Sequence, residues 1–323
     1  MDRIVFIILV VEITIMFYRD VFAGDCGVRS AYADQLIGDK RITGGQESMP
    51  GAWPWMAALY VDGPPVFFKC GAALLSERWV ITAGHCGLIA NGLALAGAHT
   101  MPSRIRVRLG EHNLNAASGS EQEIIANKVI FHPKWDILTK PSSKGPKTVS
   151  IYDMMLVELK EPAKITAQVS PICLSTQSFP PGKMCHIAGW GNEKVNGPVH
   201  GTLHEAAIPV VTQQECNKPE SYCGSITDDL VCAGFLQGGK DTCEGDSGGP
   251  LMCKGNDQRW YIAGVASFGH TECGIPHKYG IYSKIATSIE WITNNTGITL
   301  PVNTMNDYNP YSYNNYNIWN PFG

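Results

Sequence analysis

Three short segments of the chain carry residues that could perform chemistry together. Residues 240–250 read Lys-Asp-Thr-Cys-Glu-Gly-Asp-Ser-Gly-Gly-Pro, and Ser247 stands there between an aspartate and two glycines, where a sharp turn would present its hydroxyl. His85 follows an apolar run and precedes a cysteine, and Asp153 stands immediately before another apolar run. A serine hydroxyl becomes a nucleophile only with a base in reach. Each segment alone has an ordinary explanation as a surface turn, a structural histidine or a strand cap. All three in the order His, Asp, Ser point to nucleophilic catalysis.

The elements that must position these residues are short β-strands. Apolar runs rich in β-branched residues alternate with turns rich in Gly, Pro, Asn and Asp. These runs predict strands over residues 56–61, 72–75, 79–82, 105–109, 124–131, 154–159, 183–188, 204–211, 230–233, 250–253, 260–267 and 280–284. Ile285, Ile289 and Ile292 recur at helical spacing before Gly297, which predicts a terminal helix over residues 285–296. The residues therefore predict an all-β fold of two β units, as barrels or sandwiches, with a helix at the end.

Length and composition allow one large domain or two fused halves. The chain has 323 residues, of which 44% are apolar and 17% charged, so it can bury a sizeable core. A net charge of −4 gives no reason to expect nucleic acid or an anionic membrane as a partner. Eleven cysteines indicate an oxidising compartment.

The N-terminal segment predicts a secretory signal peptide over residues 1–23. A basic residue at position 3 precedes an apolar run from Ile4 to Phe17, and a small-residue cleavage site ends at Ala23. The run is shorter than the roughly 20 apolar residues that a membrane span needs, which disfavours a membrane anchor. We therefore expect a secreted, extracellular protein. In such a protein the triplet that begins at Asn294 is either a glycosylation acceptor or a bare helix end.

Three further segments differ from the β-rich part. Residues 24–41 are short and polar and end in a basic pair, and Ile-Thr-Gly-Gly follows directly, so Arg41–Ile42 is either a processing junction or an ordinary loop. Residues 138–149 are rich in Lys, Pro and Ser and predict a surface insertion. Residues 299–323 form an Asn/Tyr-rich tail without periodicity, which we expect to be flexible.

The chain resembles the chymotrypsin-fold serine proteases, in their trypsin-like branch. The likeness extends from about residue 41 to about residue 297 and rests on Gly-Asp-Ser-Gly-Gly-Pro, Gly-Trp-Gly at residues 189–191, Thr-Ala-x-His-Cys and Ile-x-Gly-Gly. A finer likeness to acrosin-like and arthropod clotting-type proteases rests on residues 51–56 and 251–254 alone.

The resemblance implies a trypsin-like peptidase domain over residues 42–298. This domain would contain two six-stranded antiparallel Greek-key β-barrels, over about 42–165 and about 166–284, with the helix at their end and the active site between them.

The resemblance also implies roles for the three reactive residues. Ser247 would be the nucleophile, His85 its general base and then the general acid, and Asp153 the group that orients the histidine. The backbone N–H groups of Gly245 and Ser247 would hold the oxyanion, each such donor lowering the barrier by about 3 kcal/mol. No cofactor would take part in catalysis.

Asp241 would lie at the base of the specificity pocket. A carboxylate in a closed slot attracts an Arg or Lys side chain, and Arg pairs with it bidentately. The residues that would line this pocket are Ser267, Phe268, Gly269 and Gly280. Glu272, where trypsin-like enzymes usually have glycine, would either narrow the mouth or favour basic substrates.

The junction at Arg41 gains a meaning from the resemblance. Cleavage there would free the ammonium group of Ile42, which would insert and pair with Asp246. The intact chain would then be a zymogen, with residues 24–41 as its propeptide or light chain.

The resemblance pairs ten of the eleven cysteines. The implied disulfides are Cys26–Cys173, Cys70–Cys86, Cys185–Cys253, Cys216–Cys232 and Cys243–Cys273. Cys223 is left over; we expect a free thiol there, although a bond to another chain or competition with Cys216 remains an alternative.

Two metal ions are further expectations from the resemblance. Glu111, the carbonyl groups of Asn113 and Ala116, and Glu121 match a loop that holds structural Ca²⁺, and oxygen ligands suit that ion. A solvated acidic loop is the alternative. Tyr279 stands where an aromatic residue accompanies a sodium-responsive loop, so Na⁺ is expected to raise activity.

These inferences combine into one functional expectation. The chain would be the secreted zymogen of a serine endopeptidase that cleaves after Arg or Lys through an acyl-enzyme, in limited proteolysis. Its partners would be protein substrates, an activating protease and a protein inhibitor, but neither nucleic acid nor membrane. The insertion over 138–149 would overhang the cleft, and its lysines would favour acidic residues upstream of the cut. The alternative is a catalytically impaired homologue that acts as a binding protein, although the chain retains all three reactive residues.

Overall fold

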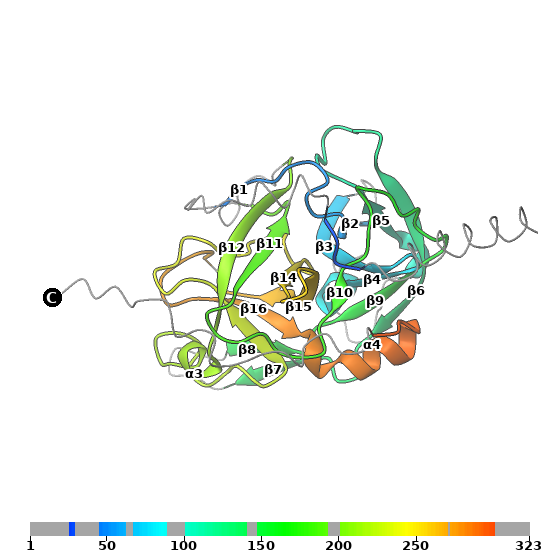
Figure 1. Cartoon of the computed structure of the whole chain (residues 1–323). Coiled ribbons are helices and arrows are strands. Elements are labelled where there is room, and N and C mark those ends of the chain that lie inside the picture. The colour runs from blue at the N-terminus through cyan, green and yellow to red at the C-terminus, as the bar shows by residue number, and fades with distance from the viewer. Residues whose placement is uncertain are drawn as a thin grey trace, which may run out of the picture.

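The computed structural model of the chain describes residues 26–29, 45–62, 67–88, 101–140, 147–192, 201–270 and 272–300. Two β-barrels lie side by side and make up most of this part (Figure 1). The predicted signal peptide, the Arg41–Ile42 junction and the tail beyond residue 300 lie outside the described residues.

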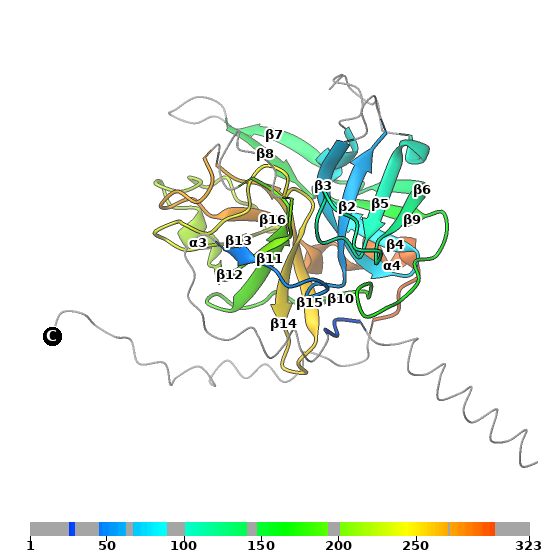
Figure 2. The same cartoon turned by 90° about the horizontal axis from the view of Figure 1, so that it is seen from above.

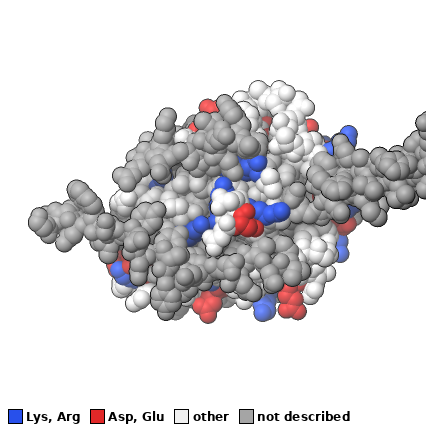
Figure 3. Space-filling model, in the orientation of Figure 1, with Lys and Arg blue, Asp and Glu red and all other residues white. Residues whose placement is uncertain are grey.

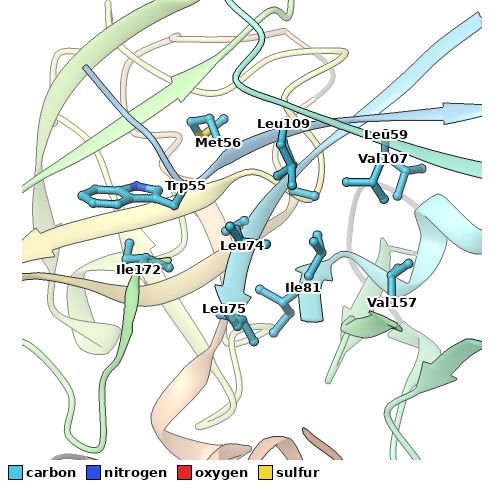
Figure 4. Close-up of a cluster of buried hydrophobic side chains, with 14 of the residues drawn as sticks. Trp55, Met56, Leu59, Leu74, Leu75, Ile81, Val107, Leu109, Val157 and Ile172 are labelled. Atoms are coloured by element: carbon cyan, nitrogen blue, oxygen red, sulfur yellow. The ribbon is translucent and has the colours of Figure 1, made fainter. Parts of the chain in front are cut away.

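The first barrel is closed and antiparallel, with six strands in the order β2-β3-β4-β9-β6-β5. In β5 the buried residues Ile105, Val107 and Leu109 alternate with two half-buried arginines, which is the period-two pattern of a strand with one face in a core. The strands are β2 (Met56–Val61), β3 (Phe67–Ser76), β4 (Trp79–Thr82), β5 (Ile105–Leu109), β6 (Gln122–Phe131) and β9 (Met155–Leu159). Figure 4 shows Leu74 and Ile81 among the apolar side chains that fill the interior. Two 3-10 turns, η1 (Gly84–Leu88) and η2 (Pro102–Arg104), connect strands on its rim.

The second barrel also has six strands, in the order β12-β11-β14-β15-β16-β13, and pairing of β12 with β13 closes it. Two short strands extend this sheet, because β1 pairs with β12 and β10 pairs with β15. The elements are β1 (Gln46–Glu47), β10 (Cys173–Leu174), β11 (Met184–Gly189), β12 (His204–Val211), α3 (Gln213–Cys216), β13 (Leu230–Ala233), β14 (Pro250–Lys254), β15 (Trp260–Phe268) and β16 (Gly280–Lys284). The predicted all-β architecture of two six-stranded barrels is confirmed.

The chain ends its described part in a helix that returns to the first barrel. The predicted helix over 285–296 is divided into a 3-10 turn, η3 (Ile285–Thr287), and α4 (Ile289–Thr296), with Ser288 between them. Ile285 and Ile292 are buried in the core of barrel 1, below which α4 lies in Figure 1. The helix therefore clamps the end of barrel 2 to barrel 1.

The Lys-, Pro- and Ser-rich segment forms a β-hairpin, which the sequence analysis did not predict. Strands β7 (Asp136–Lys140) and β8 (Lys147–Ile151) pair with each other and with no other strand of the described residues (Figure 2). The base of the hairpin packs on barrel 2, where Val149 is 2% exposed in a cluster with Tyr222, Tyr279 and Ile281. The polar composition of residues 140–147 concealed the β-branched residues on either side.

The described residues contain five disulfides, and they are the five pairings that the resemblance implied. Cys223 has an exposed, unbonded thiol. Within the described ranges, no helix has the length and apolar content needed to cross a membrane. In the part of the surface described in Figure 3, basic and acidic side chains lie beside one another rather than forming a broad patch of one sign.

The hairpin yields a stability prediction. Val149→Ala removes buried methyl groups from the contact with barrel 2 and should lower the free energy of unfolding by about 2 kcal/mol. Ile137→Ala, at a side chain of the same hairpin that is 49% exposed, should cost no more than about 0.5 kcal/mol. Urea unfolding of both variants measures the difference, and equal costs would mean that the hairpin is not docked.

Candidate active site

Asp153 is fully buried between the barrels and holds His85. The His85 Nδ1 lies 2.7 Å from Asp153 Oδ2, and the backbone N–H of His85 donates to Oδ1 at 2.8 Å. From barrel 2, the Ser267 hydroxyl donates to Oδ2 at 2.5 Å. Burial acts to raise the pKa of Asp153, but the charge and hydrogen bonds of His85 and the Ser267 hydroxyl outweigh it, and the pKa is lowered. The carboxylate therefore remains ionised against the imidazole.

The residue before Asp153 is held in a strained conformation. Tyr152 has φ 47°, in the left-handed region that bulky side chains rarely adopt. Its N–H donates at 2.8 Å to Oδ2 of Asp229, a buried residue next to β13 whose other oxygen accepts from Thr227 Oγ1 at 2.6 Å. Asp229 thus fixes, from barrel 2, the backbone that carries Asp153 in barrel 1. The sequence analysis missed Asp229, because nothing in its local sequence signals this contact.

Ser247 lies on a loop of barrel 2 that is pressed against barrel 1. The N–H of Gly71 donates to the Ser247 carbonyl at 2.8 Å, and a Cβ on Gly248 would lie 2.1 Å from Thr82 Oγ1. Thr82 is three residues before His85, so this contact brings the serine to the segment that carries the histidine. Among the described residues no hydrogen bond links the Ser247 hydroxyl to His85; such bonds commonly tighten only when substrate is bound.

Two backbone donors flank the serine hydroxyl. Gly245 has φ 96°, a conformation that a residue with a side chain would rarely adopt. No acceptor among the described residues takes the N–H of Gly245 or of Ser247. Both donors remain available for an anionic oxygen of a ligand.

Asp241 lines the same cavity as Asp246, and Gly280 lies close to its carboxylate. A Cβ on Gly280 would lie 2.7 Å from Asp241 Oδ1, so any side chain there would crowd the carboxylate. The carboxylate accepts from the N–H groups of Thr242 at 2.8 Å and Gly274 at 3.2 Å. Burial, with a smaller contribution from the charge of Asp246, raises the pKa of Asp241 to about 6, against those hydrogen bonds. A cation bound beside Asp241 would relieve this cost.

Ser267, Phe268 and Gly269 remain predicted lining residues of the specificity pocket. Ser267 is buried at the end of β15, and Phe268 packs edge-on against Tyr222 with the ring centroids 6.4 Å apart. A Cβ on Gly269 would meet nothing within 4 Å, so this glycine borders open space. Glu272 is exposed.

Asp246 lines a cavity of about 410 Å³ on the side of barrel 2 that faces β1. Its Oδ1 accepts from the N–H of Gly191 at 2.8 Å, and its Oδ2 accepts from Cys243 at 3.0 Å. Burial raises the pKa of Asp246 to about 6, although these hydrogen bonds oppose it. Gly45, three residues after Ile42, lines the same cavity.

The position of Asp246 in this cavity explains the two glycines of the Gly-Trp-Gly motif over residues 189–191. A Cβ on Gly189 would lie 2.0 Å from Asp246 Oδ1, and one on Gly191 would lie 2.5 Å from its Cγ. Both positions must be glycine for the carboxylate to lie where it does.

Comparison with known proteins agrees with this geometry. The family model described as Trypsin matches residues 42–292. The chain belongs to the trypsin family. It is 36% identical to Serine protease 1 of Rattus norvegicus over 82% of this chain and 94% of the relative. It is 36% identical to Trypsin-2 of Salmo salar over 79% and 95%, and 37% identical to Serine protease 1 of Homo sapiens over 83% and 94%.

The family membership makes the chain a trypsin-like serine endopeptidase, a hydrolase that acts on protein substrates. The named relatives do not test the finer likeness to acrosin-like or clotting-type proteases.

Gly84, next to His85, has little room for a side chain. A Cβ there would lie 2.9 Å from Cδ2 of Trp135 and 3.0 Å from Asp153 Oδ1. Trp135 stacks on Phe131 and donates from Nε1 to the Ser150 hydroxyl at 3.1 Å. The indole therefore lies beside the His85 segment, and the sequence analysis did not single it out.

The expected calcium ligands are engaged within the protein. Glu111 accepts from Arg108 Nη1 at 3.2 Å and from the N–H of His112 at 2.9 Å. Glu121 accepts from the N–H of Ser118 at 2.6 Å and from its hydroxyl at 2.8 Å, and against burial such bonds lower the pKa of Glu121 to about 2.

Of the two expected carbonyl ligands, that of Asn113 accepts from the N–H of Ala116. The calcium site remains a prediction. The one described group of three metal-ligating residue types is Cys70, His85 and Cys86, whose sulfurs are joined in a disulfide.

Two further expectations stay predictions. Tyr279 is buried, with its carbonyl accepting from the Tyr222 hydroxyl at 2.6 Å, and nothing here tests a response to Na⁺. Asn294 is exposed on the last turn of α4, where a glycan could be attached.

The contact between Asp229 and Tyr152 yields a kinetic prediction. Asp229→Ala should lower kcat at least about tenfold with KM little changed, because the freed N–H costs roughly 1–3 kcal/mol and Asp153 shifts. A displaced carboxylate stabilises the imidazolium less, so the acidic limb of the kcat/KM profile should move to lower pH.

Two variants separate this effect from general destabilisation. Asp229→Asn keeps an oxygen acceptor and should restore most of kcat, and Thr227→Val removes only the other hydrogen bond of Asp229 and should leave the pH profile in place. An unchanged pH profile in Asp229→Ala would contradict the positioning role.

Proposed function

We propose that the chain is the secreted zymogen of a serine endopeptidase that hydrolyses peptide bonds after Arg or Lys, in limited proteolysis. The observation that carries the proposal is the Asp241 carboxylate, which lines a cavity close to Gly280 and lies on the same loop as Ser247. Five disulfides and the predicted signal peptide favour an extracellular protein.

Ser247, His85 and Asp153 would perform the chemistry in two halves. His85 accepts the hydroxyl proton as Ser247 Oγ bonds to the substrate carbonyl carbon, and the N–H groups of Gly245 and Ser247 hold the oxyanion. His85 then gives its proton to the leaving amine as the C–N bond breaks, which leaves an acyl-enzyme. Water, deprotonated by the same imidazole, bonds to the acyl carbon. As the ester C–O bond breaks, the imidazolium returns the proton to Ser247 Oγ.

Asp241 would select the substrate by charge. With a pKa of about 6 it is mostly ionised at pH 7 to 8, and burial of the charge is then costly. An Arg guanidinium fits the carboxylate with two hydrogen bonds, and its charge would lower the pKa again. Binding a basic side chain thus removes a cost that the free protein bears.

The specificity prediction follows from that cost. Asp241→Ser should lower kcat/KM for Arg substrates by about thirtyfold to a few thousandfold, which corresponds to the roughly 2–5 kcal/mol for truncating one partner of a buried pair. In the parent protein, protonation of Asp241 should raise KM for Arg substrates as pH falls through about 6, whereas substrates with an apolar side chain should not show this rise. Cleavage of Arg substrates by the variant at the parent rate would refute the assignment.

Activation would use Asp246, the second carboxylate whose pKa is raised. The ammonium group of Ile42, once freed, would pair with Asp246, and the charge would lower the raised pKa of that carboxylate. A folded-state pKa above the unfolded one means that stability is lost as pH rises through about 6, so the pair would restore stability at neutral pH. The partners would include an activating protease and, after activation, a protein inhibitor.

Arg41→Ala tests the activation step. After treatment with an Arg-specific protease, this variant should stay at least about a hundredfold less active than the parent, because the buried pair cannot form. Lys40→Ala keeps Arg41 and should be activated normally. Mass spectrometry of the new N-terminus shows whether the cut occurred, and full activity of uncut Arg41→Ala would refute the zymogen proposal.

The intact set of Ser247, His85 and Asp153 disfavours the alternative of a catalytically impaired homologue that acts as a binding protein. A fluorophosphonate probe tests this, since only an active nucleophile becomes labelled.

A further inference from the structure

Three aromatic rings, from the segment before β2, from β11 and from β15, form a cage. The rings of Trp53 and Trp260 lie 4.9 Å apart and nearly perpendicular, and the His186 ring lies 5.4 Å from the first and 5.2 Å from the second. Burial lowers the pKa of His186 to about 4, with Arg29 also acting to lower it and Glu205 acting to raise it. At neutral pH all three rings are therefore uncharged.

The Arg29 side chain occupies this cage. Its guanidinium carbon lies 3.8 Å from the Trp53 ring centroid and 5.5 Å from that of Trp260. Arg29 is 7% exposed, which is unusual for a residue of a short terminal segment. A planar guanidinium over an indole face is a favourable cation–π contact, stronger when water is excluded.

The backbone before Arg29 is fitted to the same face. Gly27 donates to the Pro171 carbonyl at 2.8 Å and accepts from the N–H of Trp260 at 2.8 Å. With φ 69° and a Cβ position only 2.3 Å from the Trp260 carbonyl, residue 27 must be glycine. Cys26 adds the disulfide to Cys173.

A buried carboxylate supports the cage from the other side. Trp53 Nε1 donates to Glu205 Oε2 at 2.5 Å, and the same oxygen accepts from the Ser48 hydroxyl at 2.8 Å. Glu205 is buried, so its negative charge at the N–H edge of the indole favours a cation on the ring face.

We propose that Trp53, Trp260 and His186 bind the Arg29 guanidinium, and that this cage keeps residues 24–41 attached as a light chain after cleavage at Arg41. The inference rests on the proposed activation cut. The disulfide alone would tether the segment at one point, whereas the cage fixes its register three residues further on. It also buries the Arg29 side chain, which a protease that cleaves after arginine would have to bind.

The test uses the full chain with Cys26→Ser and Cys173→Ser, which removes the covalent tether without leaving a free thiol. After the cut at Arg41, the light-chain peptide should co-elute with the protease domain on gel filtration. Adding Arg29→Ala should speed its release at least about tenfold, and Arg29→Lys should give an intermediate rate, because lysine keeps the charge without the planar group. Val28→Ala, at a neighbour that is 47% exposed, is the matched control and should release no faster than the parent.

Equal rates of peptide release with and without Arg29→Ala in the Cys26→Ser, Cys173→Ser protein would overturn the proposal. Immediate loss of the peptide from that protein without Arg29→Ala would also overturn it. A separate arm keeps the proposal testable if Arg41 is never cut. In the uncut chain with its disulfide intact, Arg29→Ala should make the Arg29 region more accessible to hydrogen exchange over residues 26–29 and 260–261, and Val28→Ala should not. No difference between these two variants would overturn the cage independently of the activation step.

Discussion

Three carboxylates held in low dielectric determine how this structure works. An ionised carboxylate away from water is costly unless it is paired. Asp153 has its partners within the fold, because His85 and Ser267 bond to it and lower its pKa. Asp241 and Asp246 accept hydrogen bonds mainly from backbone N–H groups, and burial raises the pKa of each to about 6. The first carboxylate is therefore complete in the free protein, whereas the other two favour the arrival of a cation.

The same constraint explains why three glycines outside the loop over 240–250 lie against its carboxylates. Asp246 needs the space that Gly189 and Gly191 leave, and Asp241 needs that of Gly280. The Cys243–Cys273 disulfide joins the two sides of the pocket. Backbone strain also occurs beside the site, since Tyr152, which directly precedes Asp153, has a left-handed backbone conformation. Barrel 2 supplies the hydrogen bond that holds it, so the two barrels must be packed together before the carboxylate is in place.

Local sequence predicted most of the fold and the reactive residues but little of what connects them. Strands such as β12 and β16 were predicted to the residue because alternation and turn residues are local signals. The disulfides came from the family resemblance. The β7–β8 hairpin was missed because its polar tip dominates the composition of the segment. The contact of Asp229 with Tyr152 joins residues 77 positions apart, and no periodicity reports such a pair. The calcium loop remains a prediction, and its carboxylates bond here within the loop and to Arg108.

Glu205 contacts both sites that are proposed to act on activation: the cage that holds the light chain and the cavity that would receive the new N-terminus. It holds Trp53 in the cage, and it pairs with Gln46 in both the β1–β12 ladder and a side-chain bond of 3.1 Å. It also lines the cavity that contains Asp246. Gly45 lies between Ile42 and β1, and three residues can span at most about 10 Å, so a freed N-terminus has little choice of where to go. Because β1 is already paired with β12, the ammonium group of Ile42 can reach only positions near the cavity that contains Asp246. The ordering cost of inserting the new N-terminus is thus largely met before the cut, by contacts that the uncut chain already has.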